Sequence, residues 1–226
     1  MNVEPIVAED AEGAARLVAE LLAQAAREDK AIVLTGGNTP RRAYELAAEL
    51  EPDWDGASVW WGDERCVPPD DERSNYGMAR TALLERLASV PAVHRIQGDI
   101  DPEEAAEAYA HEVGDATLDL LLLGIGPDGH TASLFPNAPT LAERERLVVP
   151  AEPKLEPFVM RVTLTIPALE AAREIVFLAT GEEKADAVGR AFAGDPDPAT
   201  PASLVRSKTG PTRAVLDQAA ASRLFD

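Results

Sequence analysis

The chain has 226 residues, of which 40 are acidic and 21 basic, so its formal net charge is −19. Such a charge repels polyanions, and nucleic acid and anionic membrane surfaces are therefore not expected partners. No run approaches the roughly 18 apolar residues of a membrane span, and the first residues lack the blocks of a signal peptide. The single cysteine, Cys66, excludes an internal disulfide. We expect a cytoplasmic protein, a monomer or small homo-oligomer, with no metal or other cofactor.

Helical patterns alternate with short apolar strands along the chain, which is typical of a parallel sheet covered by helices on both faces. The expected helices span residues 9–28, 39–50, 75–87, 101–113 and 182–192. The expected strands span residues 31–35, 58–61, 93–96, 118–123, 161–165, 174–180 and 213–216, and a last helix follows in the tail. The most loop-like segment, 194–201, is too short to separate domains. The sequence predicts one α/β domain over residues 1–226, with a single Rossmann-like open parallel sheet.

The most informative segment spans residues 123–136 and follows the apolar run at 118–123. Such a run predicts a parallel strand that is buried on both faces. Glycines after it allow the backbone to approach a ligand closely. Asp128 and His130 follow at the carboxyl end of the strand, where open α/β sheets bind their ligands. A histidine in this place is either an acid–base catalyst or a structural part of the loop.

A second motif, Thr35-Gly36-Gly37-Asn38-Thr39-Pro40, joins a predicted strand to a predicted helix. Free backbone N–H groups at the start of a helix bind anions, and glycines keep side chains out of the way. The same residues also suit an ordinary strand-to-helix turn, so both interpretations stay open. The motif matches neither the Walker pattern nor the dinucleotide fingerprint, and neither ATP nor NAD is expected.

Three basic residues stand at the ends of predicted elements. Arg65 closes Gly62-Asp63-Glu64-Arg65 after a strand, Arg161 opens a strand, and Lys184 follows a strand-to-helix turn. Each alone is compatible with a solvent-facing charge. Together with the glycine turn they would share one rim of the sheet and gather positive charge there, and arginine forks onto phosphate or carboxylate.

The order of these segments resembles the 6-phosphogluconolactonase family of the Sol/DevB type, in the superfamily that also holds glucosamine-6-phosphate deaminase and ribose-5-phosphate isomerase. The matching blocks are residues 35–40, 61–65, 74–78, 93–96 with Gly98, 124–136, 161–164, and 179–181 with Lys184. In the deaminases a glutamate stands five residues after the histidine, where this chain has Phe135. Asn38 departs from a common serine, and Ala214 from a common tryptophan.

The resemblance implies hydrolysis of 6-phospho-D-glucono-1,5-lactone to 6-phospho-D-gluconate in the oxidative pentose phosphate pathway. Our hypothesis is that His130 takes a proton from water and returns one to the ring oxygen, while Asp128 orients the imidazole. By resemblance, Arg65 and Lys184 hold the 6-phosphate with the Gly36-Gly37 turn. The predicted substrate-binding residues are Gly36, Gly37, Asn38, Asp63, Arg65, Arg161 and Lys184.

Two alternatives belong to other classes. One is a sugar-phosphate isomerase or deaminase on the same scaffold, which Phe135 disfavours. The other is a non-catalytic sugar-phosphate sensor, because a fold does not determine a function. A sensor needs the phosphate-binding residues but neither Asp128 nor His130, and the sequence contains no recognisable output segment.

Overall fold

The computed structural model describes residues 3–224, and the strands in this range form two sheets. The main sheet is parallel throughout, with the strand order β1-β10-β9-β6-β2-β3-β5. Its strands are β1 (Glu4–Ala8), β2 (Ala31–Leu34), β3 (Ser58–Trp61), β5 (Ala92–Val93), β6 (Leu120–Gly124), β9 (Glu174–Ala179) and β10 (Thr212–Asp217). The predicted α/β fold with a parallel sheet is confirmed.

A small antiparallel sheet stands beside the main one. It has the order β4-β8-β7 and consists of β4 (Asp63–Arg65), β7 (Val148–Ala151) and β8 (Arg161–Leu164). The predicted strand at 161–165 therefore pairs outside the main sheet, because its neighbours are two strands that the sequence patterns did not predict. This pairing brings Arg65 directly opposite Arg161.

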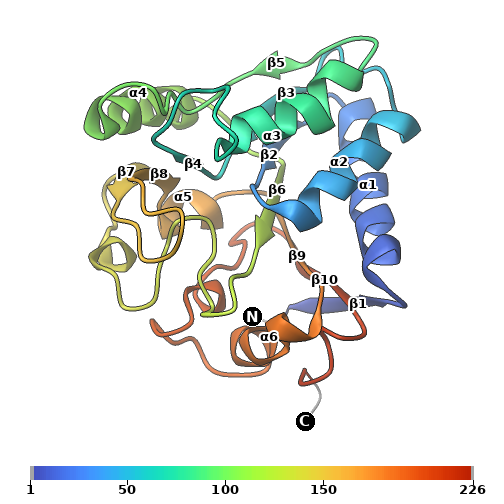
Figure 1. Cartoon of the computed structure of the whole chain (residues 1–226), viewed down its shortest axis with the longest axis vertical. Helices are drawn as coiled ribbons and strands as arrows, with labels where there is room; N and C mark the ends of the chain where they lie inside the picture. The colour runs from blue at the N-terminus through green and yellow to red at the C-terminus, as the bar shows by residue number, and fades with distance from the viewer. Residues whose placement is uncertain (1–2, 225–226) are drawn as a thin grey trace.

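The helices cover both faces of the main sheet. They are α1 (Ala11–Arg27), α2 (Asn38–Leu50), α3 (Asn75–Ala82), α4 (Pro102–Gly114), α5 (Ile166–Glu170) and α6 (Ala185–Phe192), with 3-10 turns η1 (Leu84–Arg86), η2 (Pro139–Ala142), η3 (Glu182–Lys184) and η4 (Pro201–Ser203). Figure 1 shows α1 and α2 on one side of the strands and α4 and α5 on the other, and α3 contacts α2. None of the helices within residues 3–224 combines the length and the apolar character that crossing a bilayer requires.

Helix starts follow local sequence signals. The Asp10 carboxylate accepts a hydrogen bond from the Gly13 N–H at α1, and Ser74 Oγ accepts one from the Gly77 N–H at α3. Such side-chain caps satisfy backbone donors that a helix leaves free. By contrast, α2 begins after Gly37 without a side-chain cap. Its first N–H groups are therefore available to a ligand.

Several predicted boundaries were wrong. The helix predicted at 75–87 ends at Ala82 and is followed by the separate turn η1, and the strand predicted at 93–96 pairs only over 92–93. The helix predicted at 182–192 starts with the turn η3. Residues 218–223 form turns instead of the predicted last helix, since the Asp217 carboxylate accepts the Ala220 N–H. Strand β1 was not predicted.

The connections diverge between β2 and β6. The chain leaves β2 through α2 toward β3 on one side, whereas it leaves β6 toward β9 on the other side. Such a reversal of strand order opens a crevice beyond the carboxyl ends of the two strands, where ligands bind in open α/β sheets. Leu121 and Leu123 of β6 are fully buried, which fixes this strand at the centre of the core.

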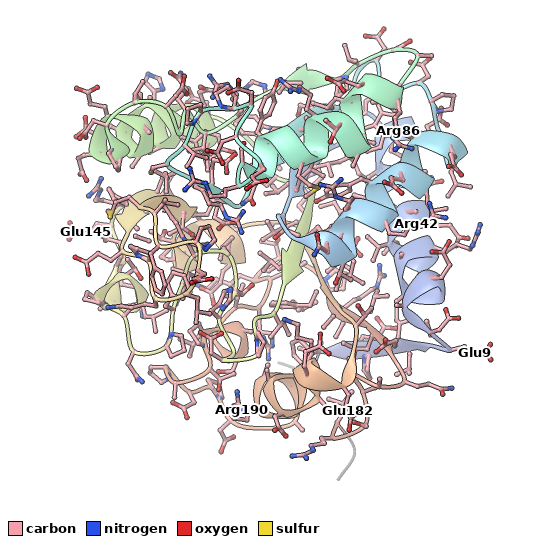
Figure 2. The ribbon with its side chains drawn as sticks, viewed as in Figure 1. Glu9, Arg42, Arg86, Glu145, Glu182 and Arg190 are labelled. Carbon is pink, nitrogen blue, oxygen red and sulfur yellow. The ribbon has the colours of Figure 1, made fainter. Side chains whose placement is uncertain are left out.

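Basic side chains on the surface outside the crevice form ion pairs with acidic neighbours. Arg42, labelled in Figure 2, projects from α2 and pairs with Glu12 of α1 across 2.8 Å. The Arg86 guanidinium in η1 pairs with Glu45 of α2 across 3.6 Å. These exposed pairs contribute little to stability individually. They show how basic side chains outside the crevice are neutralised by acids in this acidic chain.

Candidate active site

A cavity of about 230 Å³ lies at the divergence of β2 and β6. It is lined by the loops that follow β2, β6 and β9, together with residues of β4 and β8. The structure brings eight of the nine predicted site residues to this cavity, namely Gly36, Gly37, Asn38, Asp63, Arg65, His130, Arg161 and Lys184. The ninth, Asp128, does not line the cavity but contacts His130.

Asp128 holds the His130 ring from its Nδ1 side. The Asp128 Oδ1 atom lies 2.6 Å from His130 Nδ1 and also accepts the backbone N–H of His130 at 3.1 Å. Burial raises the pKa of the Asp128 carboxyl, but the hydrogen bonds and charge of His130 more than offset this and hold the pKa below its ordinary value. An ionised carboxylate only accepts hydrogen bonds, so Nδ1 carries the proton of this bond, and in the neutral imidazole the lone pair is then on Nε2.

The glycines of this loop make the arrangement possible. A Cβ at Gly126 would lie 2.0 Å from His130 Nδ1 and 2.6 Å from Asp128 Oδ1. Gly129 has a φ of +90°, which side-chain-bearing residues rarely adopt. The ring of the buried Phe135 lies 5.1 Å from the His130 ring, centroid to centroid, and is tilted against it. The imidazole thus has both a carboxylate and an aromatic ring as neighbours.

A buried polar network surrounds the cavity residue Asp63. Ser133 Oγ donates to Asp63 Oδ2 at 2.6 Å. Asn75 Nδ2 donates to the Asp63 carbonyl oxygen at 2.9 Å and to Asp63 Oδ1 at 3.3 Å. Both Nδ2 partners are acceptors, which settles the orientation of the amide. The Asn75 side chain lies against Gly36, where an added Cβ would be 1.9 Å from its Oδ1.

Three cations face the cavity without carboxylate partners. In the described part of the chain, Arg65, Arg161 and Lys184 form no ion pair within 4.0 Å. Burial lowers the pKa of Arg161 and of Lys184, although acidic neighbours oppose this. The Nε atoms of both arginines are buried and lack a hydrogen-bond partner within residues 3–224. A cavity of this kind attracts an anion.

Other contacts were not predicted. Thr39 Oγ1 and Thr180 Oγ1 lie 3.3 Å apart and link the first turn of α2 to the loop after β9. Asn75, Thr39 and Thr180 all line the cavity, and all stand inside the blocks that carried the family resemblance. Sequence reasoning gave them no role because threonines and asparagines beside a turn also serve as ordinary caps.

Comparison with known proteins assigns most of the chain to one family. The family model described as glucosamine-6-phosphate isomerases/6-phosphogluconolactonase matches residues 7–214. A curated 6-phosphogluconolactonase from Homo sapiens is 42% identical, over 93% of this chain and 88% of the relative. One from Streptomyces coelicolor is 40% identical, with the same coverage of both chains.

Solved structures agree with this assignment. The crystal structure of a protein described as devB has a TM-score of 0.89 and 33% identity, and the match covers 98% of this chain and 99% of that one. A 6-phosphogluconolactonase from Trypanosoma cruzi has a TM-score of 0.87 and 27% identity, over 100% and 99% of the two chains. The chain belongs to the family of glucosamine-6-phosphate isomerases and 6-phosphogluconolactonases, as the sequence motifs predicted.

Proposed function

We propose that the protein hydrolyses 6-phospho-D-glucono-1,5-lactone to 6-phospho-D-gluconate. One observation carries the proposal: a carboxylate-oriented histidine shares one cavity with three cations that form no ion pair among residues 3–224, in a chain of net charge −19. The names of the relatives at about 40% identity support the same reaction. We place it in the cytoplasm, whose reducing conditions suit a chain with the lone cysteine Cys66.

His130 acts as the general base in this mechanism. Asp128 keeps the proton on Nδ1, so Nε2 accepts a proton from the water molecule that attacks the lactone carbonyl carbon. The carbonyl oxygen gains negative charge as the new C–O bond forms. The bond between the carbonyl carbon and the ring oxygen then breaks, and the imidazolium returns its proton to that oxygen. Asp128 stabilises the imidazolium between these two steps.

The cations bind the phosphate. Arg65 and Lys184 hold the 6-phosphate, and the uncapped start of α2 at Gly36-Gly37 supplies backbone N–H donors. Asn38, Asp63 and Arg161 are further substrate contacts along the same cavity wall. A phosphate monoester carries a charge of about −1.5 to −2 at pH 7, so the three cavity cations are opposite in charge to the substrate and attract it. We expect no cofactor in this reaction.

The test is hydrolysis of freshly prepared 6-phosphogluconolactone, coupled to a 6-phosphogluconate dehydrogenase. Spontaneous opening of the lactone is measured without protein and subtracted. The expected result is a strong acceleration that is absent with the unphosphorylated lactone, because the cation cluster then has no anion to bind. A rate equal to the background would reject the lactonase and favour an isomerase or a sugar-phosphate sensor.

A further inference from the structure

Glu64 is a buried carboxylate that stands in sequence between two cavity-lining residues and, within residues 3–224, forms no ion pair. It is 3% exposed and lies in β4 between the site residues Asp63 and Arg65. Its Oε1 accepts the N–H groups of Arg65 at 2.6 Å and Asn75 at 2.7 Å. Its Oε2 accepts the Tyr76 N–H at 2.8 Å and the Ser74 hydroxyl at 3.0 Å. All four donors belong to β4 or to the start of α3.

These bonds fix the surroundings of Arg65. The main chain of Arg65 is bound to Glu64, and its guanidinium donates to the Arg73 carbonyl oxygen, directly before α3. The first residue of α3, Asn75, in turn bonds Asp63 and packs on the Gly36 turn. Glu64 therefore joins β4 to α3 and sets the position of the cavity wall through both elements.

Asp217 is a second buried carboxylate that accepts backbone N–H groups near a cavity cation, in this case Lys184. It is 6% exposed at the end of β10, and its two carboxylate oxygens accept the Gly181 N–H at 3.1 and 3.0 Å. Gly181 has a φ of +95°, and its carbonyl oxygen accepts the Lys184 N–H at 3.1 Å. The turn that carries Lys184 is thus tied to the last strand of the sheet. Asp217 also accepts the Ala220 N–H at 2.8 Å.

We propose that Glu64 and Asp217 are positioning residues that hold Arg65 and Lys184 in the cavity through backbone N–H groups. This inference rests on the proposed function of the two cations as phosphate ligands. A buried carboxylate needs hydrogen-bond donors or a cation. Because these two use backbone and hydroxyl donors, they leave both cations free, whereas a direct ion pair would compete with the phosphate of the substrate.

The test uses Glu64→Gln and Asp217→Asn, which keep the shape of each side chain but turn an N–H group toward a backbone donor. Glu143→Gln is the matched control, because the Glu143 carboxylate also accepts three backbone N–H groups, at 2.7, 2.7 and 3.2 Å, but lies away from this cavity. We expect KM for the phosphorylated lactone to rise about tenfold in either site variant, the effect of one lost charge-assisted contact. The value of kcat stays within about threefold of wild type, since His130 is untouched.

A second readout needs no turnover. The dissociation constant of inorganic phosphate, measured by calorimetry on folded variants, rises in parallel with KM in the site variants and not in the control. Unchanged KM and phosphate affinity in a folded site variant, or an equal change in Glu143→Gln, would overturn the inference. If the wild type does not hydrolyse the lactone, the proposed function fails, and phosphate affinity alone then decides the positioning roles. If one site variant does not fold, the other decides.

Discussion

His130 has specific side-chain neighbours that the exposed His111 lacks. Its Nδ1 contacts Asp128, its ring packs near Phe135, and its side chain is 23% exposed at the cavity. The exposed His111 instead has a side chain 86% accessible, 3.8 Å from Asp115. His130 lines a cavity and has a carboxylate that orients its ring, whereas the His111 side chain is exposed to solvent. A general base needs such an orientation toward the reacting group.

His130→Ala is expected to lower kcat by about 10²–10⁴-fold, the usual effect of losing a general base. The physical reason is that water then attacks without a proton acceptor at the carbonyl. Steady-state kinetics with the coupled assay measures this, and His111→Ala is the control expected to match wild type. Near-wild-type kcat in His130→Ala would remove the histidine from the mechanism.

Lys184→Ala is expected to raise KM for the phosphorylated lactone by about tenfold or more while kcat changes little, because a charged contact to phosphate is lost. The control is Lys208→Ala, since Lys208 pairs with Glu170 across 2.7 Å on the surface. Initial rates over a range of substrate concentrations separate the two parameters. An unchanged KM in Lys184→Ala would exclude this lysine from the phosphate site.

Cys66 is expected to be unreactive despite its place beside Arg65. Burial, with the charges of Glu64 and Asp101, raises the pKa of its thiol from 9.0 to about 11. At pH 8 roughly one thiol in a thousand is then ionised, so alkylation by iodoacetamide is slow. In the unfolded chain the Cys66 thiol ionises at lower pH than in the folded chain. The protonated thiol therefore adds to the free energy of unfolding below pH 9, and this contribution is lost as pH rises toward about 11. Rapid alkylation of the folded protein at pH 8 would contradict this.

At the scale of elements, the loop after β6 contains Gly126, whose missing side chain leaves the space that the His130 and Asp128 side chains occupy. A Cβ at Gly126 would be 2.0 Å from His130 Nδ1, so Gly126→Ala must displace the imidazole or the Asp128 carboxylate. We expect at least about a tenfold loss of kcat, since misplacement by 1 Å alone can lower rates about a hundredfold.

Thermal melting and kinetics distinguish this effect from unfolding. Gly114→Ala is the control, because a Cβ there meets only Leu147 at an ordinary 3.8 Å. The melting temperature of Gly126→Ala should stay close to wild type, since the change lies in a loop. Full activity in folded Gly126→Ala would mean that the close packing of Asp128 and His130 is dispensable.

The predictable elements are those whose signals are local. The apolar run at 118–123 identified β6, and the Thr35–Pro40 motif identified the turn into α2. Strand β1 escaped prediction because it is an exposed edge strand whose pairing partner is β10, with Glu4 opposite Arg213. Strands β4 and β7 are short and pair only through β8, which no local period indicates.

At the scale of the whole molecule, the net charge of −19 opposes an anionic substrate, while three cavity cations attract it. Long-range repulsion is screened within about 10 Å at 0.1 M salt, whereas partly buried cations in contact with phosphate are screened less. We therefore expect KM for the phosphorylated lactone to fall as ionic strength rises from about 0.01 to 0.15 M.

The control is spontaneous opening of the phosphorylated lactone without protein at each salt concentration, which is subtracted so that only the catalysed rate enters KM. All measurements use one pH and vary only the sodium chloride concentration, so that a change in KM does not arise from a change in protonation. A KM that rises steadily with salt would mean that the cavity cations dominate the field at long range as well.

The sequence by itself determined the α/β class, the family and eight of the residues that line one cavity. It did so because parallel strands deliver the loops at their carboxyl ends to one edge, so local motifs predict a shared site. Only the tertiary structure decided the second sheet, the Asn75 contacts with Asp63 and Gly36, and the hydrogen bonds that Glu64 and Asp217 accept from the N–H groups of Arg65 and Gly181. These depend on which buried polar groups find partners across separate elements, and that choice is made by packing rather than by any local pattern.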